Sequence, residues 1–484
     1  MIMKKMKYIV LCLFALTFVT TSCDDFLDIT PDGQVKRDPL LSTAEGIEDA
    51  MYGVYSQMRS TSLYGQELYF SALEILAQNM HCDGNVTVTP LSAYDYTNTN
   101  VKSLFDNVWT QMYKNISNVN SVLDAPLVAN ASEFPYTVYR GEALGLRAFM
   151  HFDLVRIFAP QYTLDTTVEG IPYATDFSLN TPDFESLEKN YAHILADLHE
   201  AELLLADEDD YEGAGNFMLD RQIHFNKYAV WATLARVYLT MGNKEKAKEY
   251  ALKTIGGKYS LKEKTEIEND LAGVLSKKEC LFGIYSSTFY EQVYAKLHLT
   301  TTRYSLNLRN DYMAIYEKDN SGLDYRVDAY FVPVTQGDEK VYRLKKLTEY
   351  YELNNMAANR PADLILGINM IRLPEMYYII AEALLEENPT EALSYYNAVR
   401  VNRGLEPLTG TALDENTGEL VERPLTVEHI NEERYKEFFG EGQEFFNKKR
   451  LNLPILSYDG ATEYKASNAM YVVPIPDAER ENRY

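Results

Sequence analysis

One stretch in the middle of the chain constrains the fold more than any other feature. Residues 226–254 place large and small apolar residues at helical spacing on both sides of a glycine: Trp231, Leu234, Ala235 and Tyr238, then Gly242, then Ala247 and Ala251. Large residues of one helix can pack on the alanines of the next helix, and the glycine permits a tight turn between them. The pattern therefore predicts two antiparallel helices joined at Gly242.

This spacing is typical of a tetratricopeptide repeat. Residues 141–158 and 186–206 form a second predicted helix pair, and residues 371–403 form a third with a looser match. A single helix pair cannot bury its apolar face alone, so such pairs stack into a right-handed superhelix. We predict a mainly α fold, organised as a tetratricopeptide-like helical-repeat superhelix.

Residues 257–365 do not follow the helical pattern. They contain a strand-like CLFGIY run, Tyr-rich stretches, Pro333 and Gly337. We interpret them as an inserted irregular subdomain carrying short strands. The insertion separates an N-terminal helical region, 41–256, from a C-terminal one, 366–484.

Four shorter segments complete the prediction. Residues 81–100 are rich in Asn and Thr and predict a loop, whereas the partners of Trp109 at helical spacing predict a core position for that ring. A helix is expected near 426–449. Two prolines exclude helix from 471–476, which predicts an extended end.

The N-terminus has the form of a targeting signal. Residues 1–22 combine early lysines, an apolar run over 8–19 and small residues before Cys23. The apolar run is shorter than the roughly 20 residues that span a bilayer. We predict a lipoprotein signal peptide over 1–22, lipidation of Cys23 and a polar tether over 23–40.

Composition narrows the classes of function. The chain has 46 Lys and Arg against 71 Asp and Glu, a formal net charge of −25 over 484 residues. A protein so acidic has little with which to neutralise phosphates, so a nucleic-acid partner is not expected. Aromatic residues are mostly Tyr, 38 of them against 2 Trp, and a Tyr ring suits both packing and binding surfaces.

We find no motif that carries catalysis. The sequence lacks a phosphate-binding glycine loop, a GxSxG elbow and an HExxH helix. His193 and His199 are six residues apart and face different sides of one predicted helix, which argues against a metal site. Cys82 and Cys280 are interpreted as buried free thiols rather than a long-range disulfide. We therefore expect no catalytic residue, no metal and no cofactor.

Six segments in order resemble one family over nearly the whole chain. They are 23–31 (CDDFLDITP), 143–156 (ALGLRAF leading to LVR), 194–201, 371–383 (IRLPEM leading to AEA), 433–442 (ER followed by EFFGEG) and 474–479 (PIPD with Glu479). Together they resemble the SusD/RagB family. Gln443 and Asn447 depart from the family's usual Arg and Asp, and both lie in the scaffold.

The resemblance implies an outer-membrane lipoprotein on the cell surface. It implies a tetratricopeptide scaffold that packs as a hinged lid on a SusC-like TonB-dependent transporter, and ligand capture rather than catalysis. Asp24 and Asp25, directly after Cys23, are similar to a surface-export signal of this family. Lipid addition to Cys23 would anchor the chain, because each buried CH₂ contributes about 0.8 kcal/mol.

The leading hypothesis is capture of a glycan. Aromatic rings would stack on sugar C–H faces, and Asn, Asp or Arg would pair with hydroxyls. The resemblance places the site in two regions, whose candidate residues are Asp83, Asn85, Tyr94, Tyr96 and Asn98 in the loop, and Tyr285, Tyr290, Tyr294, Tyr304 and Arg309 in the insertion. Packing of these tyrosines within the subdomain is the competing interpretation. Capture of an oligopeptide by the same architecture remains the alternative function.

Overall fold

The computed structural model describes residues 37–178, 180–211, 213–268, 275–297, 306–309, 311–318, 322–336, 339–348, 365–413 and 420–481. The predicted signal peptide, Cys23 and Tyr304 lie outside these residues. The last four residues of the predicted tether form the short helix α3 (Arg37–Leu40).

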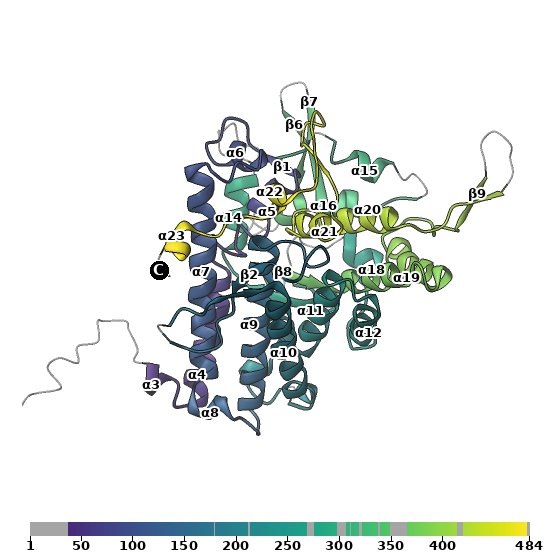
Figure 1. Ribbon diagram of the computed structural model, residues 1–484. Helices are drawn as coiled ribbons and strands as arrows, with labels where there is room; N and C mark the ends of the chain where they lie inside the picture. Colours follow the sequence, from purple (N-terminus) through teal and green to yellow (C-terminus); the bar gives the residue numbers. More distant parts are fainter. Residues whose placement is uncertain are drawn as a thin grey trace, which may run out of the picture.

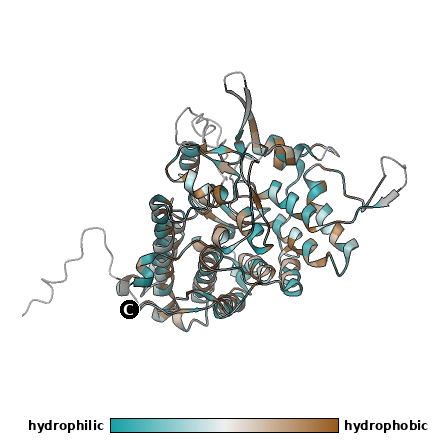
Figure 2. Ribbon diagram, turned by 45° about the horizontal axis from the view of Figure 1, so that its top comes forward, coloured by the Kyte–Doolittle hydropathy of each residue, from teal (hydrophilic) through white to brown (hydrophobic). Residues whose placement is uncertain are grey.

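Long helices dominate the described chain, which confirms the mainly α prediction (Figure 1). In chain order they are α4 (Ala44–Met58), α7 (Thr99–Leu123), α9 (Tyr136–Phe158), α10 (Leu187–Leu204), α11 (Lys227–Thr240), α12 (Lys244–Ile255), α18 (Leu373–Leu384), α19 (Pro389–Asn402) and α20 (Val427–Phe438). Brown and teal alternate along these helices in Figure 2, as expected for helices with one face toward a core.

Asparagine begins several of these helices. The side-chain oxygen of Asn98 accepts from Asn100 N at α7, that of Asn226 from the backbone of the first turn of α11, and that of Asn243 from Lys246 N at α12. Such caps satisfy backbone N–H groups that have no partner inside the helix. At the turn between α11 and α12, Gly242 has φ +77°, a conformation that glycine adopts without a steric penalty. The predicted helix pair and its turn are therefore confirmed.

Six of the long helices form a row in which each helix packs on the next one. The contacts are α9 with α10, α10 with α11, α11 with α12, α12 with α18 and α18 with α19. Because α12 contacts α18 directly, the chain leaves the row after α12 and returns to its next position about 120 residues later. The superhelical geometry and the domain boundaries stay predictions.

Between α12 and α18 the described residues form short elements. They are α13 (Lys264–Glu268), β4 (Cys280–Tyr285), α14 (Phe289–Leu297), β5 (Asn307–Leu308), α15 (Ala314–Glu317), α16 (Tyr325–Tyr330), β6 (Phe331–Gln336), β7 (Glu339–Leu344) and β8 (Gly367–Arg372). Within the described ranges strands pair two by two and antiparallel: β4 with β8, β6 with β7, and β5 with β1 (Met80–His81). The same holds for β2 (Glu169–Pro172) with β3 (Phe184–Ser186), β9 (Thr411–Leu413) with β10 (Leu420–Glu422), and β11 (Ile455–Leu456) with β12 (Glu463–Tyr464).

A buried ionic network fastens the insertion to the C-terminal helices. Arg403, 1% exposed, donates to both carboxylate oxygens of Glu437 on α20 and to Glu279 beside β4. Arg372 reaches Glu437 as well, with Nη1 2.6 Å from Oε1. Buried charges of this kind are tolerated only when they are mutually paired, so the network fixes where the insertion sits.

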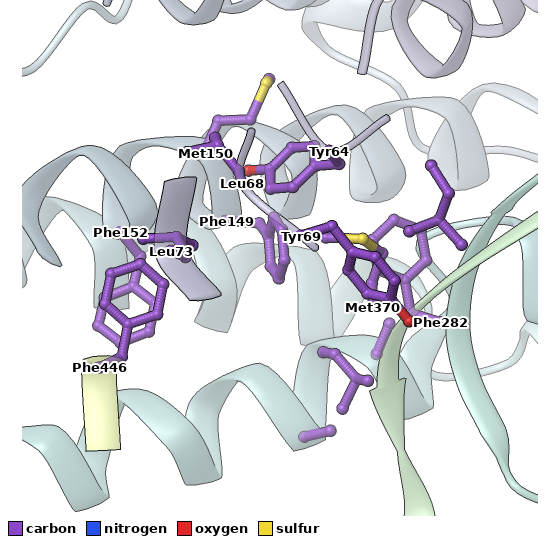
Figure 3. Close-up of a cluster of buried hydrophobic side chains, with 14 of the residues drawn as sticks. Tyr64, Leu68, Tyr69, Leu73, Phe149, Met150, Phe152, Phe282, Met370 and Phe446 are labelled. Atoms are coloured by element: carbon purple, nitrogen blue, oxygen red, sulfur yellow. The ribbon is translucent and has the colours of Figure 1, made fainter. Parts of the chain in front are cut away.

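One apolar core runs through the molecule. Figure 3 shows a part of it: the ring of Phe149 on α9 contacts Tyr64 and Phe282 of β4, and Phe446 of α21 (Glu444–Arg450) lies beside Phe152 of α9. Trp109 is 2% exposed, as its helical partners predict. The core therefore draws on segments from both ends of the chain and from the insertion.

Two expectations need correction. Residues 426–449 form two helices, α20 and α21, because Gly440 and Gly442 between them take φ values of +80° and +69° that end the first helix. Residues 81–100 contain a short helix, α6 (Val88–Ser92), which their content of Asn and Thr does not predict. Cys82 and Cys280 are buried and form no disulfide among the described residues, as predicted.

The remaining short helices fill gaps between the long ones. They are α5 (Ala72–Leu76), α8 (Pro126–Ala129), α22 (Asn468–Tyr471) and α23 (Asp477–Glu481), together with three 3₁₀ turns between 208 and 223. Among the described residues, no helix combines the length and apolar character needed to cross a bilayer.

Candidate functional site: a polar pocket beside strands β1 and β5

Strand pairing brings the two predicted ligand regions together. Met80 of β1 faces Leu308 of β5, and His81 faces Asn307. The backbone N of Arg309 adds a hydrogen bond of 2.9 Å to Asn79 O. Two segments more than 220 residues apart in sequence thus form one antiparallel strand pair. The loop after β1 therefore lies beside the insertion.

A pocket of about 400 Å³ opens at this junction, where α6 and α14 meet the first turns of α7. Hydroxyl and amide side chains supply most of its wall: Thr61, Ser62, Gln66, Ser71, Asn85, Thr87, Asn100, Ser103 and Asn107. Ile75, Val88, Leu91, Leu104 and Leu306 form the apolar part. In Figure 1, α6, β1 and α14 gather near the upper end of α7. A wall with many neutral donors and acceptors suits a ligand rich in hydroxyl groups.

Two charged residues complete the lining, Glu67 and Lys296. Glu67 Oε1 accepts from Gln66 Nε2 at 2.5 Å, and Oε2 accepts from Ser71 Oγ at 2.9 Å. Burial raises the pKa of the Glu67 carboxyl, and these hydrogen bonds together with the positive charge of Lys296 act against that rise. The pocket is therefore mostly neutral in character, with one carboxyl already held by neighbouring donors.

Asn85 is the predicted ligand residue that lines the pocket. Its Oδ1 accepts from the backbone N of Thr87 and of Val88, both at 3.0 Å, and so fixes the start of α6. Asp83 lies two residues earlier with its side chain 78% exposed. It accepts from Tyr458 Oη at 2.8 Å, a contact with the C-terminal part of the chain. Asn98 caps α7.

The two tyrosines of this loop are held by their hydroxyl groups. Tyr94 Oη donates to Leu76 O at 2.9 Å, and its ring meets Tyr464 edge-on at 4.9 Å. Tyr96 is 7% exposed and donates to Met470 O at 2.7 Å. Tyr96 thus has no open ring face, in keeping with the packing interpretation.

The candidates of the insertion differ in their exposure to solvent. Tyr290 is 1% exposed against Phe289, whereas Tyr285 at the end of β4 is 46% exposed. Tyr294 is half-buried on α14. Arg309 is buried, and its Nη2 lies 3.1 Å from Asp311. Among the described lining residues of the pocket there is no aromatic ring.

Sequence reasoning missed most of the pocket wall. Asn100, Ser103 and Asn107 stand three and four residues apart on one face of α7, and this polar stripe was the available signal. Gln66 and Ser71 carried no signal, because only the tertiary fold places their segment opposite α7. The same holds for Tyr458, which meets Asp83 across 375 positions.

Comparisons with known proteins agree with this architecture. A family profile described as "Starch-binding associating with outer membrane" matches residues 25–239, and the SusD family profile matches residues 236–483. SusD-like protein P2 of Formosa agariphila is 25% identical, with 99% of this chain and 97% of the relative covered. SusD-like protein P38 of the same organism is 23% identical over 93% of this chain and 92% of its own.

Solved structures share the fold. A SusD superfamily protein from Bacteroides thetaiotaomicron superposes with a TM-score of 0.69 at 23% identity, covering 91% of this chain and 98% of the other. A structure described as a laminarin binding SusD-like protein has a TM-score of 0.65 at 19% identity, covering 90% and 96%. With one profile spanning the C-terminal half and relatives aligned end to end, the chain belongs to the SusD/RagB family.

Proposed function

We propose that this protein is a cell-surface lipoprotein of the outer membrane that captures a glycan and delivers it to a partner SusC-like TonB-dependent transporter. The observation that carries the proposal is the hydroxyl- and amide-lined pocket beside β1 and β5. The family description as starch-binding and outer-membrane associated, and a structural neighbour that binds laminarin, support the same class of ligand.

Pocket chemistry favours recognition of hydroxyl groups by hydrogen bonds. Ser103 and Asn107 are exposed on α7, so they can meet a ligand without a large rearrangement of the backbone. Each neutral hydrogen bond of this kind contributes about 0.5–1.5 kcal/mol. Several together give useful affinity without an aromatic platform inside the pocket.

A glycan array followed by calorimetry tests the ligand class. We expect Asn107→Ala to weaken binding of the best glycan by roughly 2- to 13-fold, which corresponds to one lost hydrogen bond. Asn118→Ala is the matched control, because Asn118 is exposed on the same helix and does not line the pocket. Chromatography of the recovered glycan should show no hydrolysis.

Equal affinities of Asn107→Ala and Asn118→Ala for that glycan would contradict the placement of the site. Binding of oligopeptides with no glycan bound would contradict the ligand class and favour peptide capture by the same architecture. Appearance of shortened glycans would contradict the absence of catalysis.

Delivery requires a complex with the transporter. Tethering both partners to one membrane raises their effective concentration, so a modest interface suffices. Affinity purification of the tagged protein from detergent extracts should recover a TonB-dependent transporter in near-equal amount. Recovery of the protein alone would count against this step.

A further inference from the structure

Tyr458, in the turn between β11 and β12, is held from three directions. Its ring stacks on His81 with centroids 4.0 Å apart and planes 10° from parallel. Its hydroxyl donates to Asp83 Oδ1 at 2.8 Å, and its backbone N donates to Gln78 Oε1 at 3.3 Å. The side chain is nevertheless half-buried rather than enclosed.

Gln78 links this tyrosine to the loop after β1. The side chain is 1% exposed, and its Nε2 donates to Ser92 O at 2.7 Å and lies 3.4 Å from Tyr94 Oη. One buried amide therefore positions Tyr458 on one side and residues 92–94 on the other.

Backbone strain gathers at the same place. Gln78 has φ +63° and Tyr94 has φ +57°, the left-handed region that side chains rarely occupy. Such conformations are energetically unfavourable and persist where surrounding contacts fix them, often at binding sites. Here the two strained residues contact each other and both hold the surface that carries Tyr458.

The surface has the parts that a sugar needs. His81 covers one face of the Tyr458 ring, and the ring remains partly exposed; Asp83 beside it is an acceptor whose side chain is 78% exposed. An aromatic ring in a fixed orientation favours a C–H face of a sugar, while a neighbouring carboxylate accepts from its hydroxyl groups. The hydrogen bond to Asp83 also raises the pKa of Tyr458 to about 12, so the phenol stays neutral.

This surface borders the pocket. Asp83 and Asn85 are two residues apart, so their Cα atoms lie at most about 7 Å from each other. Asn85 lines the pocket, and Asp83 holds Tyr458. A glycan longer than the pocket can therefore continue across the loop onto the tyrosine.

We propose that Tyr458 and Asp83 form an aromatic subsite that stacks on a sugar unit of the captured glycan, adjacent to the pocket beside β1 and β5. The inference rests on the proposed glycan capture and adds to it the residues that supply stacking, which the pocket itself lacks. Gln78 is a positioning residue of this subsite.

Calorimetry with maltoheptaose, laminarihexaose and the best glycan from the array tests the subsite on the full chain. Tyr458→Ala and Tyr458→Leu should both weaken binding about tenfold, on the scale of aromatic contacts. Tyr458→Phe keeps the ring and should lose less than about threefold. The leucine variant refills the apolar space without a ring, which separates stacking from packing. Leu456→Ala, 40% exposed on the same hairpin, is the control and should keep full affinity.

The outcomes separate the subsite from the pocket and from the proposed function. Unchanged affinity in Tyr458→Leu, with weaker binding in Asn107→Ala, would overturn the subsite and leave the pocket intact. An equal loss in Leu456→Ala would show that the hairpin acts through folding, which also overturns it. A wild-type chain that binds none of the glycans would overturn the proposed function itself, and the subsite with it.

Discussion

Glu74 allows the buried electrostatics of this fold to be tested by pH. The side chain is fully buried in α5, where Asn79 Nδ2 donates to Oε2 at 2.7 Å and Gly442 N donates to Oε1 at 2.6 Å. The Glu74 carboxylate therefore links α5, which borders the pocket, to the turn between α20 and α21. Burial raises the pKa of Glu74 to about 7 from an ordinary value of 4.5, and the two hydrogen bonds limit the rise.

The sign of the pH effect follows from this rise. Below pH 4.5 the carboxyl is protonated in both the folded and the unfolded chain, so its burial does not reduce the free energy of unfolding. Between pH 4.5 and about 7 the unfolded chain releases this proton while the folded chain keeps it. The free energy of unfolding therefore falls by about 3 kcal/mol, since each pKa unit corresponds to about 1.4 kcal/mol, and the loss is complete once the pH has risen through 7. Glu74→Gln is neutral at every pH and should remove this loss. Asn79 donates Nδ2 to residue 74 in the wild type, and its Oδ1 has no hydrogen-bond partner among the described residues. A turn of the Asn79 amide by about 180° therefore lets Oδ1 accept from the new amide.

Urea denaturation of Glu74→Gln and the wild type at pH 4.5, 6 and 8 measures the difference. The variant should match the wild type at pH 4.5 and exceed it by up to about 3 kcal/mol at pH 8. Other titrating groups cancel in the difference, and Glu133→Gln, an exposed glutamate, is the control. A difference that stays constant across this pH range would refute the reasoning, because it would show that Glu74 has the same pKa in both states.

Three further predictions concern the scaffold and the anchor. Ala247→Trp should cost roughly 1–3 kcal/mol through overpacking of α12 on α11, seen as a lower Tm, since Ala247 is 0% exposed; an unchanged Tm would contradict that packing. Arg403→Met should lower the free energy of unfolding by about 3–5 kcal/mol, because Glu437 and Glu279 lose a buried partner. Lys244→Met breaks the exposed pair with Glu386 and should lower it by less than about 1 kcal/mol. Equal losses in the two variants would argue against the buried network. Cys23→Ala should release the protein from the membrane fraction or block its maturation, as fractionation and immunoblotting would show, and unchanged membrane association would rule out lipidation at that residue.

Several elements were predictable from local pattern. The helices α11 and α12 follow from apolar spacing, and their turn follows from Gly242, because a helix and its turn depend on residues a few positions apart. The core position of Trp109 follows in the same way. The split of 426–449 into α20 and α21 was not predicted. A Cβ at Gly440 would clash with Leu344, and one at Gly442 would clash with the backbone of residues 68 and 69, so the need for glycine comes from distant parts of the chain.

Fold class, the helix pairs and the family could be predicted from the amino-acid pattern alone, because these depend on periodicities and motifs written along one chain. The same pattern also pointed to the loop after β1 and to the insertion as the places to look for a ligand. Which side chains face the pocket depended on how distant segments pack together. Asn107 and Gln66 line it, whereas Tyr96 and Tyr290 are packed in the core. The physical reason is that exposure depends on what lies across from a side chain, and here the opposing surfaces come from residues tens to hundreds of positions away, as Tyr458 opposite Asp83 shows.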